Sequence, residues 1–193
     1  MTPTTGKLVF LAGPSCAGKT TLGTATRDRL GLPWLFWEID RVGPRLPASA
    51  IVQPEQIAEL TRDELESAVH LQDRLVEASL GAIRAYVDRG FRVIAEVFLW
   101  GQRQRRIADT VLSDLSPVVV ELRCPVDILE QRERIRATTY EGTARTQASW
   151  EWLLSPDLVL DATLPSADLA YNLATWLESS PSSRWREHVE SAS

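Results

Sequence analysis

The chain has 193 residues, of which 44% are hydrophobic and 24% charged, a composition typical of one globular domain. Its 21 Lys and Arg against 26 Asp and Glu argue against a nucleic-acid-binding protein, because such proteins carry an excess of basic side chains. Two cysteines, Cys16 and Cys124, are too few for a disulfide framework or a metal cluster. We expect no signal peptide and no membrane anchor, and therefore a cytoplasmic protein.

Apolar runs alternate with helical patterns along the chain, which is the order of an α/β protein. The predicted strands are short and mostly apolar, as buried parallel strands are, and cover residues 7–12, 34–39, 92–99, 117–122 and 158–160. The predicted helices lie between Gly18 and Gly31 and at residues 55–89, 102–115, 125–136 and 166–178. The sequence therefore predicts a five-stranded parallel sheet flanked by helices.

Three stretches show no periodic pattern. Residues 41–54 contain several prolines and are predicted to form a loop, and residues 137–149 are polar and are predicted to be mobile. The Ser-rich tail at 179–193 is expected to fray. We expect one domain over residues 1–178, with a mobile lid at about 132–149.

A phosphate-binding motif follows the first predicted strand. Residues 13–20 read GPSCAGKT and match G-x-x-x-x-G-K-[ST] at every fixed position. The glycines let backbone N–H groups turn toward phosphates, Lys19 is expected to reach the β- and γ-phosphates, and the Thr20 hydroxyl is expected to bind Mg²⁺. The predicted residues for ATP are Gly13, Pro14, Ser15, Cys16, Ala17, Gly18, Lys19, Thr20 and Thr21.

Two acidic residues are expected to face this loop, because ligands of parallel sheets bind beyond the carboxyl ends of the strands. Asp40 follows the second predicted strand and is predicted to be the general base for a hydroxyl acceptor, with a cap or surface role as its alternative. Glu96 lies in the third predicted strand. It could hold Mg²⁺ through water, bind a substrate hydroxyl, or form a structural ion pair.

Arginines and tryptophans complete the candidate site. Arg132 and Arg136 lie one helical turn apart beside the predicted lid, where they could clamp phosphates. Trp37 and Trp100 could form the wall of an aromatic acceptor pocket, and core packing is an equal alternative. Arginines at 103, 105 and 106 begin a predicted helix and give a weak hint of an anionic ligand.

The motif alone allows several classes of nucleotide-binding protein. A GTPase is disfavoured because the chain has no N-K-x-D motif, and its only lysines are Lys7 and Lys19. Motor and transporter ATPases are usually larger. The sequence favours a kinase for a small molecule, and a nucleotide-binding regulatory protein without catalysis is the alternative from another class.

Taken together, these residues resemble the chloramphenicol phosphotransferase-like P-loop kinases, over most of residues 6–178. Besides the phosphate loop, the resemblance rests on Pro33-Trp34-Leu35 before Asp40, Val97-Phe98-Leu99, Arg123-Cys124, Arg132-Glu133, Arg136, Gly142 and Gln147.

The resemblance implies a P-loop kinase fold and Mg²⁺-dependent transfer of the ATP γ-phosphate to a hydroxyl of a small molecule. In the namesake this is the primary hydroxyl of chloramphenicol, and its phosphorylation inactivates the antibiotic. It also implies Asp40 as the base and Arg136 as a lid arginine. Thr139 replaces a second lid arginine, for which Arg145 could compensate, and Ala95 replaces an acidic residue. Another antibiotic, a nucleotide or a sugar nucleotide is therefore the alternative acceptor.

Overall fold

The computed structural model describes residues 7–38, 59–96, 99, 101–136, 141–149, 155–179 and 181–185. Five strands form one sheet, and all four strand pairs are parallel. The strands are β1 (Leu8–Ala12), β2 (Trp34–Trp37), β3 (Arg92–Glu96), β4 (Val118–Arg123) and β5 (Leu158–Asp161), in the spatial order β2-β3-β1-β4-β5. The prediction of a five-stranded parallel sheet is confirmed.

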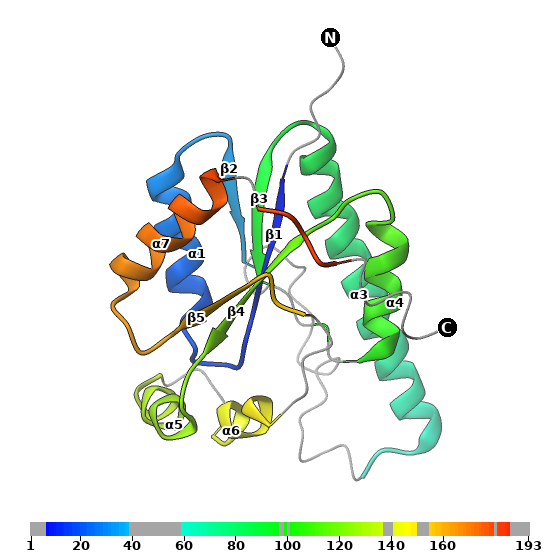
Figure 1. Ribbon diagram of the computed structural model, residues 1–193. Coiled ribbons are helices and arrows are strands. Elements are labelled where there is room, and N and C mark those ends of the chain that lie inside the picture. Colours follow the sequence, from blue (N-terminus) through cyan, green and yellow to red (C-terminus); the bar gives the residue numbers. More distant parts are fainter. Residues whose placement is uncertain are drawn as a thin grey trace.

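Helices cover both faces of the sheet (Figure 1). On one face lie α1 (Lys19–Leu30) and α7 (Ser166–Glu178), and on the other lie α3 (Arg62–Asp88) and α4 (Gln102–Val111). Two further helices, α5 (Val126–Ile135) and α6 (Thr143–Ala148), lie beyond the carboxyl ends of the strands. This end of the sheet is where the sequence places the phosphate loop.

The central strand β1 joins the two halves of the core. Its side chains alternate between the faces, as the pleat of a strand requires. Val9 and Leu11 pack in the cluster that contains α1 and α7, and Phe10 packs in the cluster that contains α3 and α4. All three side chains are fully buried, so the element that carries the phosphate loop is held on both faces.

The long helix α3 begins later than predicted. A capping box starts it: Thr61 Oγ1 accepts from the Glu64 N–H, and the Glu64 carboxylate accepts from the Thr61 N–H. This satisfies backbone groups that the first turn leaves without partners. The predicted start at residue 55 was wrong, although the T-x-x-E pattern at 61–64 is visible in the sequence.

Part of the segment predicted to lack regular structure is the helix α6. Glu133 of α5 accepts hydrogen bonds from the N–H groups of Gly142 and Ala144 at 2.9 and 2.8 Å. A helix of six residues is too short to show apolar periodicity, which is why the sequence did not predict it. Such a helix is also unstable alone, and the hydrogen bonds from Glu133 explain why it forms.

The beginning of the Ser-rich tail is docked and does not fray. Trp185 is only 4% exposed, and its ring packs edge-on against Phe10 at 5.5 Å. The Arg105 guanidinium lies over the Trp185 ring at 3.9 Å from the centroid, and it also donates to the Trp185 carbonyl. The expectation of a frayed tail was therefore wrong for residues 181–185, because one aromatic side chain fills a site in the core.

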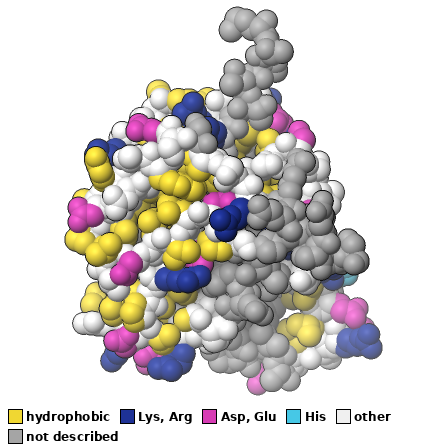
Figure 2. Space-filling view, in the orientation of Figure 1, with side chains coloured by type: hydrophobic (Ala, Val, Ile, Leu, Met, Phe, Trp, Pro, Cys, Tyr) yellow, Lys and Arg dark blue, Asp and Glu magenta, His cyan; other side chains and the backbone are white. Residues whose placement is uncertain are grey.

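No described helix is both long and apolar enough to span a bilayer. On the face seen in Figure 2, the described Lys and Arg side chains are interspersed with Asp and Glu. Hydrophobic side chains gather on the side of α1 and α7 (Figures 1 and 2).

Candidate functional site

The loop between β1 and α1 needs glycine where it leaves the sheet. Gly13 has φ +136°, and a Cβ atom there would lie 2.7 Å from the carbonyl oxygen of Leu122 in β4. Any side chain would therefore collide with backbone of the neighbouring strand. Gly18, with φ +94°, precedes the first residue of α1. The loop thus lies tight against the carboxyl ends of β1 and β4.

Lys19 folds back along the loop from the first turn of α1. Its side chain is only 6% exposed, and Nζ donates to the carbonyl oxygens of Gly13 and Pro14, both at 2.9 Å. Burial of an ammonium group is costly without such partners. The charge is held beside the first residues of the loop, a position typical of the lysine that contacts the β- and γ-phosphates.

The next residue joins the loop to β3. Thr20 Oγ1 donates a 2.7 Å hydrogen bond to Glu96, which is 3% exposed and ends β3 beside Leu11 of β1. The structure thus brings together the two residues that the sequence predicts for Mg²⁺. Because the hydroxyl hydrogen points to Glu96, its oxygen lone pairs stay available to a cation.

These oxygen donors fit Mg²⁺, which takes few protein ligands and completes its octahedral shell with water and phosphate oxygens. The described part of the chain contains no cluster of three or more His, Cys, Asp or Glu side chains that could hold a metal ion. Any Mg²⁺ here would therefore depend on bound phosphates as well as on Thr20.

Arg132 connects α5 to the loop. Its guanidinium donates to the Cys16 carbonyl at 3.4 Å and to the Ala162 carbonyl, beyond β5, at 2.8 Å. It also lies 3.8 Å from the Cys124 sulfur, and burial raises the pKa of that thiol. Beside Arg132, a pocket at the carboxyl ends of β4 and β5 is lined by Arg123, Cys124, Pro125, Val159, Leu160 and Asp161.

A second contact to the loop comes from α6. The Ser15 N–H donates to Gln147 Oε1 at 2.6 Å, and Gln147 is 8% exposed. Sequence reasoning gave Gln147 no role beyond its place in the family resemblance. Ser15 and Gln147 are 132 positions apart in the sequence, so no local pattern could have predicted the contact.

Known proteins are similar to this chain in sequence. A family model described as "Chloramphenicol phosphotransferase-like protein" matches residues 6–178. The chain belongs to this family. Two Mycobacterium tuberculosis proteins named "Putative O-phosphotransferase" are 36% identical over 106 residues, covering 49% of this chain. The matched region is about half of those relatives, at 47% of their length.

Solved structures of kinases share the fold. A sugar kinase from Janibacter is 22% identical, with a TM-score of 0.61 over 90% of this chain and 95% of its own. The APS kinase CysC of Mycobacterium tuberculosis, in complex with AMPPNP and APS, is 17% identical, with a TM-score of 0.62 over 91% and 99% of the two chains. At these identities the likeness shows the P-loop kinase fold that the sequence predicts.

Other arginines singled out in the sequence have protein partners or are exposed. Arg136 is exposed at the end of α5. Arg145 pairs with Glu130, which raises the pKa of the Arg145 guanidinium. Arg103 pairs with Asp73, and Arg105 with Asp109. Both guanidinium groups thus have acidic partners within the protein, and the hint of an anionic ligand on α4 stays a prediction.

The acceptor side of the predicted site is only partly within the described residues. Trp37 packs edge-on against Tyr86 of α3, with ring centroids 5.9 Å apart, so part of its ring contributes to that face of the core. Asp40, Trp100 and Thr139, the position where the family has a second lid arginine, lie outside the described residues.

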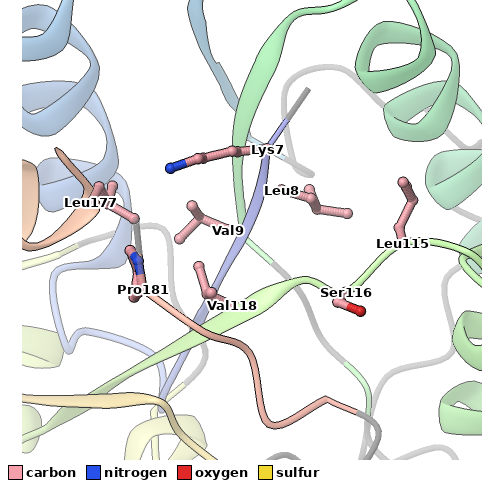
Figure 3. Close-up of a pocket in the computed structure, with 8 residues that line it drawn as sticks. All are labelled: Lys7, Leu8, Val9, Leu115, Ser116, Val118, Leu177 and Pro181. Carbon is pink, nitrogen blue, oxygen red and sulfur yellow. The ribbon is translucent and has the colours of Figure 1, made fainter. Parts of the chain in front are cut away.

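A small cavity opens at the opposite end of the strands from the phosphate loop. It has a volume of about 130 Å³ and lies at the amino ends of β1 and β4 (Figure 3). Leu8, Val9, Val118 and Leu177 give it a largely apolar lining, and Lys7 stands at its rim. Because the phosphate loop follows the carboxyl end of β1, this cavity is no part of the nucleotide site.

Proposed function

We propose that this protein transfers the γ-phosphoryl group of ATP to a hydroxyl group of a small molecule. The observation that carries the proposal is the hydrogen bond from Thr20 to the buried Glu96, next to a Lys19 ammonium held inside the loop. A cation and a metal-binding hydroxyl positioned by a carboxylate are the parts that phosphoryl transfer needs around the leaving group.

The remaining roles follow from position. Lys19 neutralises charge on the β- and γ-phosphates, and Arg132 and Arg136 are lid candidates for the transferred group. The pocket beside Arg132 suits the nucleotide base, since it lies beyond the same strand ends as the loop. Mg²⁺, bound by Thr20 and oriented by Glu96, would neutralise charge on the phosphate oxygens.

Asp40 is our candidate base, by its position after β2 and by the family resemblance. Its carboxylate would accept the proton of the acceptor hydroxyl as that oxygen bonds to the γ-phosphorus. The bond between the γ-phosphorus and the bridging oxygen breaks, and ADP leaves with that bonding pair.

The first experiment measures ADP release from Mg·ATP with chloramphenicol, and then with hydroxyl-bearing antibiotics, nucleotides and sugar nucleotides. The mass of the true acceptor should increase by one phosphoryl group. Asp40→Asn should abolish this turnover and keep nucleotide affinity within about threefold of the wild-type value. The reason is that the base stabilises the transition state and does not contribute to ATP binding.

Asp28→Asn is the matched control, because Asp28 is exposed on α1 and pairs only with Arg27 among the described residues. It should turn over like the wild type. Retained turnover in Asp40→Asn would remove Asp40 as the base. Tight ATP binding without release for any acceptor would favour the regulatory protein, for which the nucleotide is a signal and not a substrate.

A further inference from the structure

The peptide group between Pro14 and Ser15 is held from two directions. Its carbonyl oxygen accepts from Lys19 Nζ at 2.9 Å and from the Ala17 N–H at 3.3 Å, and its N–H donates to Gln147 Oε1 at 2.6 Å. In a trans peptide these two groups point in opposite directions. Lys19 therefore contacts one side of the loop and Gln147 contacts the other.

Gln147 is well placed to hold this peptide in one orientation. It belongs to α6, whose first turn is fixed by the buried carboxylate of Glu133 through two hydrogen bonds. Arg132, one residue before Glu133, donates to the carbonyl of Cys16, the residue after Ser15. The helices α5 and α6 thus contact two consecutive loop residues, Ser15 and Cys16. Cys16 has a φ of +63°, in the left-handed region that residues other than glycine rarely adopt.

We propose that Gln147 is a positioning residue for Lys19. By accepting from the Ser15 N–H, it keeps the Pro14 carbonyl turned toward the Lys19 ammonium, and so directs that charge toward the β- and γ-phosphates. The inference rests on the proposed nucleotide site. It adds that a side chain of the predicted lid, Gln147, determines the direction in which the Lys19 ammonium points.

Loss of the Gln147 oxygen, which accepts the hydrogen bond from Ser15, should weaken nucleotide binding. Gln147→Met keeps the length of the side chain and removes the oxygen that accepts from Ser15. We expect affinity for both ADP and AMPPNP to fall about tenfold, the usual effect of one lost hydrogen bond at a charged site. In the ligand-free protein, the Ser15 amide proton should exchange faster with solvent.

Thr146→Ala is the matched control. Thr146 is exposed on the same helix, and its hydroxyl bonds only to the Gly142 carbonyl among the described residues. It should leave both affinities and the exchange of the Ser15 amide unchanged. A comparison of Tm values separates loss of the contact from loss of the fold.

A double-mutant cycle with Lys19→Ala distinguishes positioning from simple packing. If Gln147 acts through Lys19, then Gln147→Met should weaken ADP binding about tenfold in the wild type and less than twofold in Lys19→Ala. Losses that multiply across the cycle, or wild-type affinity in Gln147→Met, would overturn the inference. If the wild type itself binds neither nucleotide at millimolar concentration, the proposed function has failed first.

Discussion

The carboxyl and amino ends of the parallel strands are surrounded by different kinds of side chain. Around the phosphate loop lie three polar, buried side chains, those of Lys19, Glu96 and Gln147. At the amino ends, the space between β1, β4 and α7 is lined mostly by leucine and valine. Burial of charge lowers stability unless each group finds a partner, whereas apolar burial stabilises directly.

The two regions should therefore respond differently to substitution. Changes around the loop should reduce nucleotide binding and turnover while the free energy of unfolding stays nearly constant. Changes in the apolar core should lower the free energy of unfolding while the folded molecules bind nucleotide normally. Three substitutions test this contrast, and a fourth, at the exposed cap of α3, lies in neither region.

Lys19→Ala should have the largest effect. It removes the cation held between the carbonyls of Gly13 and Pro14, so kcat/KM should fall by about 100-fold to 1,000-fold, as for loss of one preorganised charge. The Tm should change little, because the buried ammonium itself is costly. Initial rates of ADP release and titration with ADP check both values, and unchanged affinity would contradict the assignment of the loop.

Trp185→Ala tests the other side of the contrast. It removes a ring buried against Phe10 and Arg105, so the free energy of unfolding should fall by about 3 kcal/mol. Urea unfolding measures this value, and ADP affinity at low temperature should match the wild type. Arg184→Ala is the control, because its side chain is exposed and only its backbone N–H contacts Asp157. A weakened ADP affinity in Trp185→Ala would show that the two regions are coupled.

Glu96→Gln should reduce activity through the metal. The amide oxygen can still accept from Thr20, so the geometry is kept and the negative charge is lost. We expect the Mg²⁺ concentration for half-maximal rate to rise about tenfold, by analogy with loss of an outer-shell carboxylate. Glu77→Gln, exposed on α3, should leave the Mg²⁺ dependence unchanged. If the two variants behave alike, Glu96 has only a structural role.

Thr61→Ala should have the smallest effect. It removes the cap of α3 and should lower the free energy of unfolding by about 1 kcal/mol, without a change in ADP affinity. Thr61 also holds the pKa of the Glu64 carboxyl below its usual value through hydrogen bonds. This contribution is present above the pKa of unfolded Glu64 and is lost as pH falls through the lowered pKa. The variant should therefore differ less from the wild type in acid than at neutral pH.

Local patterns account for the parts of the fold and site that the sequence predicts. The strands are apolar runs, and residues 13–20 carry spaced glycines and a lysine whose geometry recurs in every phosphate loop of this type. Glu96 could be identified because an acidic residue inside an apolar strand needs a partner. The structure supplies that partner, Thr20, which the motif had already marked.

The features that were not predicted depend on contacts distant in sequence. Nothing near Gln147 indicates that its amide reaches Ser15, and α6 exists because Glu133 binds its first turn. Trp185 lies in a polar, Ser-rich stretch, and its burial depends on the space left by Phe10 and α4. Sequence periodicity reports the face of one element and carries no information on which partner a single side chain meets.

The edge position of β2 bears on how new specificities could arise in this fold. Among the described strands, β2 pairs with β3 alone and lies at one end of the strand order, whereas β1 pairs with β3 and β4. Insertions and exchanges between β2 and α3 leave the hydrogen-bond ladders of the central strand intact. A graft of residues 39–58 between relatives should thus transfer acceptor preference as a module, while the machinery that handles phosphate is inherited unchanged.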